Sequence, residues 1–297
     1  MPTLQSPPTL SVIINFYNPN DVSRITTMVL LAMECIVAYT TSPLELILVD
    51  GSGKKTEAVA EECQKRGWIY LECPQKGAFS RIYNQGMEAA TGDYRVWMAS
   101  DLFVTSGWDL KLIAEMQRTG AMMATPYLTN SDYPGQVLNW VVKMRTFTPC
   151  WMTFNLNMIT RECFEKIGGM DERFTGNFND MDYMIRIRKA GGEAIIVNCN
   201  QIAHLARATS SVASTFNWYQ DRDRLQEKYP ELKLKNFNKE KDNDHGWRVV
   251  DLRSPLFSRS KIFKAIMTAS YALPGTSVLS DRLVRLAMRF EPLLHQV

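Results

Sequence analysis

The chain has 297 residues, of which 45% are hydrophobic and 22% charged, and its formal net charge is +3. It is long enough for one large domain or two small ones, and so small a positive charge, without a long basic run, excludes a typical nucleic-acid-binding protein. Six cysteines at irregular spacings, with no C-x-x-C pair, argue against a zinc site or a disulfide framework and favour a reducing compartment. Residues 1–10 lack a signal-peptide pattern and the apolar run 28–39 is too short to span a bilayer, so we predict a cytoplasmic protein.

Strands and helices alternate in the first hundred residues. Apolar and β-branched runs predict strands over 10–16, 44–49, 68–72 and 94–98. Apolar residues at helical spacing, with turn residues at the ends, predict helices over 25–38, 56–67 and 80–90. Alternation with short connections predicts an α/β fold of the Rossmann-like kind, in which a mostly parallel sheet has helices on both faces.

The chain changes character at Gly120, after which prolines and aromatic residues predict irregular loops. Order returns further on, with a strand expected over 194–197 and helices over 161–168, 180–190 and 217–228. Asp180 stands where the N-cap of the second of these helices is expected. Asp182 and Arg186 form an i,i+4 pair with the acid first, which is the favoured order.

The segment after residue 232 differs in composition. Residues 233–244 are largely charged and are expected to be exposed, and two amphipathic helices follow within 258–294. The second helix has an apolar stripe with basic residues beside it: Leu279, Leu283, Leu286 and Phe290, flanked by Arg282, Arg285 and Arg289. Three interpretations stay open, namely contact with an anionic membrane, contact with a partner or second copy, and packing on the same domain as a helical cap.

Polar residues follow or end three of the predicted strands, namely Asn15, Asp50 and Asp101. Because ligands bind beyond the carboxyl ends of the strands in parallel sheets, we expect a polar site at this rim. The glycine-rich loops G-x-G-x-x-G and G-x-x-x-x-G-K-[ST] are absent from the sequence, which removes the support for a dinucleotide-binding or P-loop protein.

Five segments of the chain match one family in the family's order: LSVIINFYNP, LELILVDGSG, SRIYNQGMEAATGDYRVWMASD, GGMDERFTGNFNDMDYMIRIRKAGG and AHLARATSS. Together they resemble the family 2 glycosyltransferases of the GT-A fold, over about residues 10–229. The resemblance implies transfer of a sugar from a nucleoside-diphosphate-sugar to a hydroxyl of a glycan or lipid-linked glycan, usually with inversion. It also implies a GT-A domain over 1–232, with a nucleotide-binding half (about 1–120) and an acceptor half (about 121–232). Residues 233–297 lie outside the resemblance and are predicted to be a C-terminal extension with amphipathic helices.

A divalent metal is the cofactor that the resemblance implies. Charge grows on the diphosphate as the sugar bond breaks, and a hard ion such as Mn²⁺ or Mg²⁺ neutralises it. Asp101 matches the last acid of the family's D-x-D motif, with Ala99 in place of the first acid, and His204 matches a histidine that supplies a further ligand. With a single carboxylate, the donor's phosphates must supply much of the coordination. Taken alone, Asp101 also fits a solvated loop acid and His204 a structural histidine.

A general base is also needed, to take the proton of the attacking hydroxyl. Asp180 matches the family's base, with Asn179 in place of the usual glutamate. The competing interpretation is a helix N-cap, which would leave the carboxylate less free to react. Asp182 is the alternative base or an acceptor contact, although its pairing with Arg186 favours a structural role.

The resemblance implies further contacts with the substrates. Those with the donor are assigned to Asn15, Phe16, Asp50, Arg81, Asn84, Ser100 and Asp101. Arg81 suits bidentate phosphate binding, although it also fits a surface cation, and Asn84 also fits a packing residue. Trp151 is assigned to the acceptor, with a core position as the alternative. Two other Asp-x-Asp pairs, Asp221/Asp223 and Asp242/Asp244, are interpreted as solvated faces without a role.

Three hypotheses follow from the sequence. The leading one is a metal-dependent inverting glycosyltransferase, cytoplasmic or peripheral at the inner face of a membrane. The second is a weak or inactive GT-A domain that binds glycans or acts as a scaffold, because Ala99 and Asn179 replace two of the family's acids. The third is a nucleotidyltransferase, which ranks last because the glycine-rich loop expected after its first strand is missing.

Overall fold

A computed structural model describes residues 7–126, 155–197, 199, 202–204, 217–231, 247–250, 262, 266, 269, 273 and 278–289. The strands of the main sheet are β1 (Leu10–Phe16), β2 (Leu44–Asp50), β3 (Ile69–Glu72), β4 (Tyr94–Ala99), β6 (Met123–Pro126), β7 (Leu156–Thr160), β8 (Ala194–Val197) and β10 (Trp247–Val250). A small second sheet pairs β5 (Leu102–Val104) with β9 (Ile202–His204). The helices are α1 (Ser23–Tyr39), α2 (Glu57–Arg66), α3 (Phe79–Ala89), α4 (Trp108–Thr119), α6 (Arg161–Ile167), α7 (Asn179–Lys189), α8 (Trp218–Lys228) and α10 (Val278–Met288).

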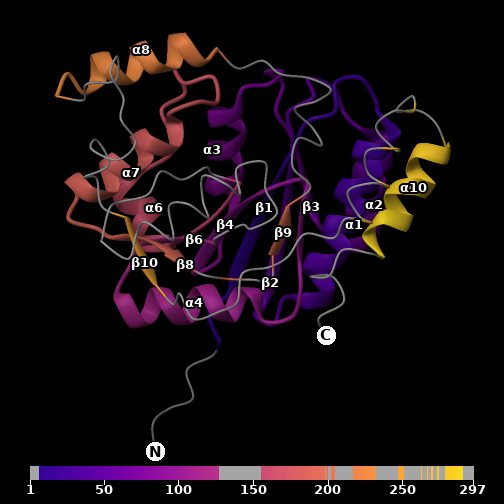
Figure 1. Ribbon diagram of the computed structural model, residues 1–297, viewed down its shortest axis with the longest axis horizontal. Helices are drawn as coiled ribbons and strands as arrows, with labels where there is room; N and C mark the ends of the chain where they lie inside the picture. Colours follow the sequence, from indigo (N-terminus) through magenta and orange to yellow (C-terminus); the bar gives the residue numbers. More distant parts are fainter. Residues whose placement is uncertain are drawn as a thin grey trace, which may run out of the picture.

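The described strands of the main sheet follow the order β10-β8-β6-β7-β4-β1-β2-β3 (Figure 1). β1 is parallel to both β2 and β4, whereas β7 runs antiparallel to β4 and β6. β8 is parallel to β6 and to β10. The prediction of a mostly parallel sheet with flanking helices is therefore confirmed, as are the helices and strands expected before residue 100 to within a few residues at their ends.

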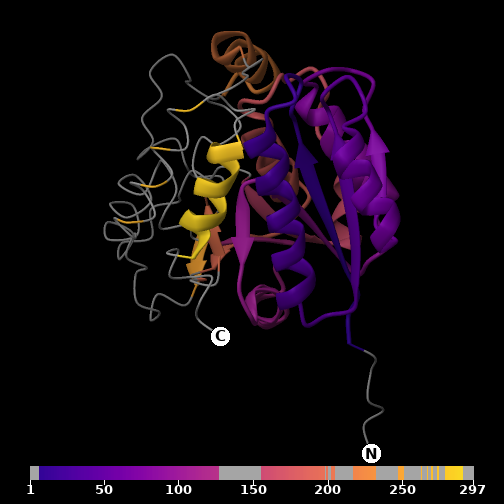
Figure 2. The same ribbon diagram turned by 90° about the vertical axis from the view of Figure 1, so that its right-hand side faces the viewer.

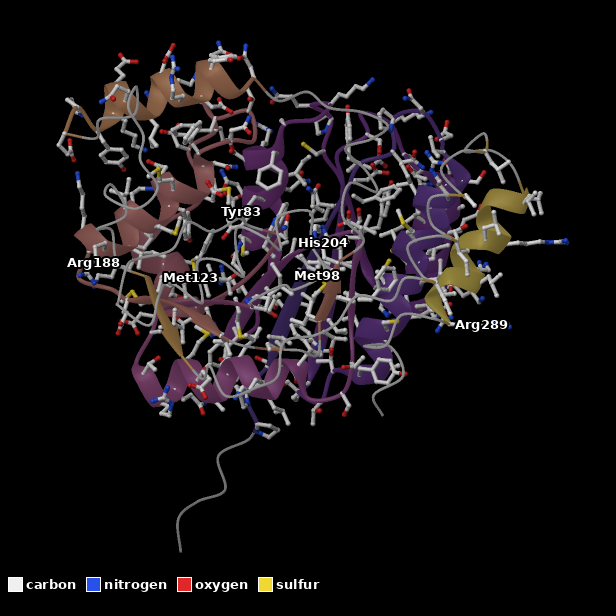
Figure 3. The ribbon with its side chains drawn as sticks, in the orientation of Figure 1. Tyr83, Met98, Met123, Arg188, His204 and Arg289 are labelled. Atoms are coloured by element: carbon white, nitrogen blue, oxygen red, sulfur yellow. The ribbon has the colours of Figure 1, made fainter. Side chains whose placement is uncertain are left out.

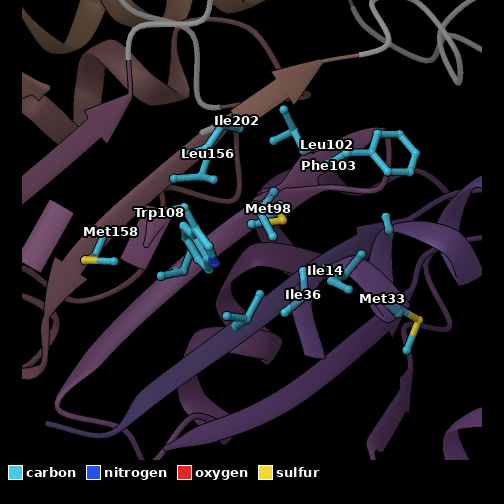
Figure 4. Close-up of a cluster of buried hydrophobic side chains, with 14 of the residues drawn as sticks. Ile14, Met33, Ile36, Met98, Leu102, Phe103, Trp108, Leu156, Met158 and Ile202 are labelled. Atoms are coloured by element: carbon cyan, nitrogen blue, oxygen red, sulfur yellow. The ribbon is translucent and has the colours of Figure 1, made fainter. Parts of the chain in front are cut away.

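Both faces of the sheet are buried, which explains why β1 has a continuous run of apolar residues. Ile14 of β1 and Met98 of β4 belong to a hydrophobic cluster that α1 and α4 cover (Figure 4). Ile13 and Trp97, one residue earlier in each strand, belong to the cluster on the opposite face, with residues of α3 and α7. Since side chains alternate along a strand, each strand contributes to both clusters. A shift of the pairing by one residue would move these side chains to the wrong face, so burial fixes the register.

The stretch after Gly120 contains more regular structure than expected. β6 and β7 lie within it and form the middle of the sheet, so the prediction of irregular loops is wrong for these residues. Both strands are short, and their stability comes from neighbouring strands that are distant in sequence, which local patterns do not report. β5, α4, β9 and β10 were also not expected from the sequence. Residues 233–244 and Trp151 lie outside the described residues.

The segment predicted as a helical extension contributes to the main fold in two ways. β10 pairs with β8 at one edge of the sheet, and α10 lies beside α1 (Figure 2). Among the described helices, none combines the length and apolar character needed to cross a membrane. Among the described residues, no two cysteines form a disulfide with each other. The domain boundary near residue 232 and the two halves of the GT-A domain stay predictions.

Candidate active site

The parallel strands bring polar residues to one rim of the sheet. Asn15 of β1 lies opposite Val49 of β2 and Ala99 of β4, and the next residue pair is Phe16 with Asp50. The Asn15 side-chain oxygen is buried, and no donor among the described residues bonds to it. A buried acceptor without a donor is uncommon in native proteins, so this oxygen is available to a bound molecule or to water.

Asp101 and His204 meet at this rim although they are far apart in the sequence. Asp101 comes directly before β5, and the antiparallel pairing of β5 with β9 sets Leu102 opposite His204. The Asp101 Oδ1 atom lies 3.3 Å from the His204 Nε2 atom, and the two side chains are only 8% and 10% exposed. Figure 3 labels His204 at this position. The structure therefore brings together the two residues that the sequence assigned to a metal.

The spacing and chemistry of Asp101 and His204 fit two of the ligands in the coordination shell of a divalent ion. A carboxylate oxygen and an imidazole nitrogen are both used by manganese-type ions. Two neighbouring ligands in an octahedral shell, each about 2.1 Å from the ion, lie about 3 Å apart, close to the observed 3.3 Å. Within the described residues there is no group of three His, Cys, Asp or Glu side chains that could hold a metal ion. Phosphate oxygens and water are ligands that could complete the set beside these two residues.

Asp50 is buried and accepts several hydrogen bonds from its own loop. Its Oδ1 atom accepts from the Ser52 backbone N–H at 2.9 Å, and its Oδ2 atom accepts from the Tyr70 hydroxyl at 2.7 Å and the Thr56 backbone N–H at 3.1 Å. Burial, followed by this bond to Asp50, raises the pKa of Tyr70 well above its ordinary value. Asp50 thus shapes the loop between β2 and α2, and its contact with a nucleotide stays a prediction.

The two α3 residues assigned to the donor have different surroundings. The Asn84 amide exchanges two hydrogen bonds with the Met170 backbone, at 3.0 and 2.7 Å, so its contacts match the packing interpretation. A side chain at Gly169 would approach Asn84 Oδ1 to 2.3 Å, which explains why glycine suits that position. Arg81 is half exposed, and its closest carboxylate is that of Glu172 at 3.4 Å. Its guanidinium is accessible to an anion.

Two further donor-contact residues lie in the interior. The Phe16 ring is fully buried in the hydrophobic cluster beneath α1, so the side chain lies away from solvent. Ser100 is also buried and comes directly before Asp101. Their contacts with a donor stay predictions.

Asp180 lies in the first turn of α7 and is not its N-cap. The helix begins at Asn179, and Phe178 occupies the N-cap with a left-handed backbone (φ 58°) and without a capping side chain. The N-cap interpretation of Asp180 is therefore wrong. The Asp180 carboxylate accepts a hydrogen bond from the Met181 N–H at 2.8 Å. Burial, which removes water from the charged form, raises the pKa of Asp180 from 3.8 to about 7, against a smaller lowering by backbone N–H groups.

Asp182, two residues later, has a different environment. It is fully buried, and its carboxylate is bound by Arg186 at 3.0 Å, by Lys228 at 2.6 Å and by the Tyr229 hydroxyl at 2.9 Å. The predicted pair with Arg186 is confirmed. The carboxylate oxygens are already occupied by these three groups, so the contacts favour the structural role for Asp182.

The sequence analysis was wrong about Asp221, which was interpreted as part of a solvated face. Asp221 is fully buried and accepts hydrogen bonds from the backbone N–H groups of Thr175, Gly176 and Asn177, at 2.9, 3.2 and 3.0 Å. Asp223 is exposed, as expected. A signal was present in the sequence, because Asp221 precedes Leu225 and Tyr229 at i,i+4 spacing, which predicts one shared face. The structure buries all three side chains, with Tyr229 at the C-cap of α8.

Comparison with known proteins agrees with this architecture. The family model described as glycosyl transferase family 2 matches residues 11–175. A mannosyltransferase from Pyrobaculum calidifontis, PcManGT in complex with GDP-Man and Mn²⁺, has a similar fold, with a TM-score of 0.56, 13% identity, and coverage of 97% of this chain and 82% of that chain.

Residues 1–349 of S. aureus TarS match with a TM-score of 0.44 and 14% identity, over 59% of this chain and 54% of that chain. The chain thus spans about half the length of that structure. No curated protein matches the chain. The family match includes more than half of the residues and coincides with the GT-A arrangement of strands described above. The chain therefore belongs to glycosyl transferase family 2.

Proposed function

We propose that this protein transfers a sugar from a nucleoside-diphosphate-sugar to a hydroxyl of a glycan or lipid-linked glycan, with inversion at the sugar carbon. The observation that supports this most is the coexistence of two different acidic sites. Asp101 and His204 form a close pair at the rim of the nucleotide-binding sheet. Asp180 is a separate buried carboxyl whose pKa is about 7.

The donor end of the site is proposed to lie at the strand rim. Asp101 and His204 would hold Mn²⁺ or Mg²⁺, which neutralises negative charge on the diphosphate when bound. The similar fold that was solved with GDP-Man and Mn²⁺ makes these the first donor and metal to test. Arg81, which is half exposed, adds positive charge for a phosphate, and the unbonded Asn15 oxygen is suited to accept a hydrogen bond from the base or ribose.

The acceptor hydroxyl is proposed to be activated by Asp180. Its ionised carboxylate takes the hydroxyl proton while the acceptor oxygen forms a bond to the sugar carbon. At the same time the bond from that carbon to the phosphate oxygen breaks, and the nucleoside diphosphate leaves with the electron pair. A base whose pKa is near neutrality is ionised in about half the molecules at pH 7 and still basic enough to react. One direct displacement inverts the configuration.

A glycan-binding module with weak or no activity is the second candidate. Ala99 and Asn179 stand where the family has acids, so both the metal site and the base site have fewer carboxylates than usual. A protein of this kind would bind glycans and release no nucleoside diphosphate from any donor in the presence of metal and acceptor.

Donor binding should depend on a divalent ion. We expect GDP-Man, or another member of a nucleotide-sugar panel, to raise the melting temperature with Mn²⁺ and not with EDTA, since ligand at 100 times its Kd stabilises the folded state by about 2.7 kcal/mol. Asp101→Asn should abolish the metal-dependent shift, whereas Glu88→Gln, at an exposed α3 position, should leave it unchanged. An equal shift in EDTA would contradict the assigned metal site.

Removing the base should separate binding from transfer. Asp180→Asn keeps the acceptor of the Met181 N–H bond, so the donor-induced thermal shift should stay at its wild-type size. The rate of nucleoside diphosphate release in the presence of acceptor should fall by about 10²–10⁴, the usual contribution of a general base. Asp223→Asn, which changes an exposed acid, is the control. Full transfer by Asp180→Asn would rule out Asp180 as the base.

The raised pKa of Asp180 also predicts a pH-dependent stability. Between pH 4 and 7 the folded protein keeps a proton on Asp180 that the unfolded chain has lost, so this group lowers the free energy of unfolding as pH rises. The free energy of unfolding of Asp180→Asn minus that of wild type should therefore increase by roughly 3 kcal/mol as the pH is raised from about 5 to about 8. Urea unfolding at several pH values measures this difference. A difference that does not change with pH would show that the carboxyl is not desolvated.

A further inference from the structure

Helix α8 holds the loop that leads into α7 (Figure 1). In addition to the three backbone N–H groups of residues 175–177, the Asp221 carboxylate accepts from the Thr175 hydroxyl at 2.7 Å and from Arg224 at 3.0 Å. One buried carboxylate thus accepts hydrogen bonds from all three backbone N–H groups of residues 175–177, the segment just before Phe178 and α7.

This loop has a backbone that needs support. Phe178 has a φ of 58°, a left-handed conformation that costs energy for a bulky residue and persists only where its surroundings enforce it. Asp180 follows two residues later, so the direction of its carboxylate depends on how the chain leaves Phe178.

Helix α8 also contacts α7 on the other side of Asp180. Near the end of α8, the Lys228 ammonium lies 2.6 Å from Asp182, and the Tyr229 hydroxyl donates to the same carboxylate at 2.9 Å. The residues before and after Asp180 are therefore both attached to one helix. Except for Thr175, the residues that make these contacts lie beyond the segment that the family model matches.

We propose that α8 positions the general base, with Asp221 as the residue that holds the loop in front of it. Asp221 is a positioning residue and does not contact the reacting atoms. This inference rests on the proposed function, because it takes Asp180 as the base. A carboxylate can accept bonds from several N–H groups at once, whereas an asparagine amide has one oxygen and would turn its own NH₂ toward the remaining donors.

Loosening the loop has a defined electrostatic consequence. Burial is the main cause of the raised pKa of Asp180, and no charged side chain contributes to that shift. The charged groups of the surrounding elements pair with one another: Asp182 with Arg186 and Lys228, Asp171 with Arg173 and Lys228, and Asp221 with Arg224. If the loop opens, water reaches the Asp180 carboxyl and its pKa falls toward 3.8.

The test compares Asp221→Asn with Asp223→Asn, an exposed acid on the same helix. In Asp221→Asn, kcat at pH 8 should fall about tenfold, and the acid limb of the kcat–pH profile should move to lower pH by about one unit or more. The metal-dependent rise in melting temperature caused by the donor should be unchanged. Thr175→Val removes the hydrogen bond from the Thr175 hydroxyl to Asp221, so it should also move the acid limb to lower pH, by a smaller amount. Asp223→Asn should match wild type. A lower rate with an unmoved acid limb in Asp221→Asn would overturn the proposal.

A second measurement separates this proposal from the proposed function. Carbon NMR titration of the Asp180 carboxyl, assigned by its loss in Asp180→Asn, gives its pKa without any substrate. A lower pKa in Asp221→Asn than in wild type supports positioning by α8, even if the wild-type protein transfers no sugar and the proposed function fails. An unchanged pKa in a folded Asp221→Asn variant overturns positioning, whatever the activity.

A separate observation concerns the outer face of α10. This helix lies beside α1, and its other side exposes Val278, Leu279 and Leu286, which are 68%, 53% and 39% exposed. Three arginines are exposed on the same helix, namely Arg282, Arg285 and Arg289 at its end. Their spacing sets them in a row along the face that also contains the three apolar residues. Arg24 of α1 also donates a hydrogen bond to the Leu273 carbonyl at 3.5 Å.

We infer that this α10 face binds the surface of a bilayer that contains anionic lipids. Three guanidinium groups complement lipid phosphates, and each basic residue near such a surface strengthens binding about fivefold. The exposed leucines would enter the boundary between headgroups and acyl chains, where their contact with water is removed. This mode of binding needs no membrane-spanning helix, and none of the described helices is long and apolar enough to be one.

Vesicle co-sedimentation tests the α10 face. The full chain should bind vesicles of phosphatidylcholine mixed with phosphatidylglycerol, bind pure phosphatidylcholine at least tenfold more weakly, and dissociate in high salt. The triple variant Arg282→Glu, Arg285→Glu, Arg289→Glu should lose binding. The control is the triple variant Lys65→Glu, Arg66→Glu, Arg118→Glu, which makes the same change in net charge on α2 and α4. This control should retain most of the vesicle binding. Equal loss in both triple variants, or dimerisation through Leu279 and Leu286 without vesicle binding, would overturn the proposal.

Discussion

The parallel pairing of β1 with β2 and β4 is the constraint on which the site depends. It exists because both faces of these strands are buried, so a slip by one residue would move apolar side chains to the wrong layer. The register sets Asn15 beside the ends of β2 and β4, and the chain after β4 continues directly into Asp101. The small sheet of β5 and β9 then brings His204 to the same rim.

Three buried acids on α7 and α8 show how packing gives one residue type different properties. Asp182 is compensated by two cations and a hydroxyl, and Asp221 by backbone N–H groups and an arginine. Asp180 is buried without a charged partner among the described residues, so desolvation dominates and its pKa rises to about 7. Loss of water is costly for a charged carboxylate unless other groups replace its hydrogen bonds. The difference in compensation, more than the difference in burial, distinguishes a structural acid from one suited to exchange a proton.

The residues of the proposed site lie partly inside and partly outside the segment that the family model matches. Asn15, Asp50, Arg81 and Asp101 lie within residues 11–175, whereas Asp180, His204 and Asp221 lie beyond them. The first group depends on the regular alternation of strands and helices, which local sequence patterns describe well. The second depends on α7 and α8, which are joined through the contacts of Asp182 and Asp221, and on β9, which pairs with β5 from far along the chain. The matched region therefore contains the donor end of the proposed site, and the later elements contain the proposed base.

The sequence by itself determined the alternation of the first four strands and three helices and the Asp182–Arg186 pair, because both follow from contacts close in the chain. It also indicated the polar rim with Asn15, Asp50 and Asp101, because the carboxyl ends of parallel strands meet at one edge of a sheet. Only the tertiary structure decided that β6 and β7 form the middle of the sheet, that Asp180 is not an N-cap, and that Asp221 is buried. The positions of β6 and β7 and the burial of Asp221 depend on partners far away in the sequence. Burial and hydrogen-bond compensation are properties of the folded surroundings, and the pattern of residues along a helix does not specify which neighbour will cover its acidic face.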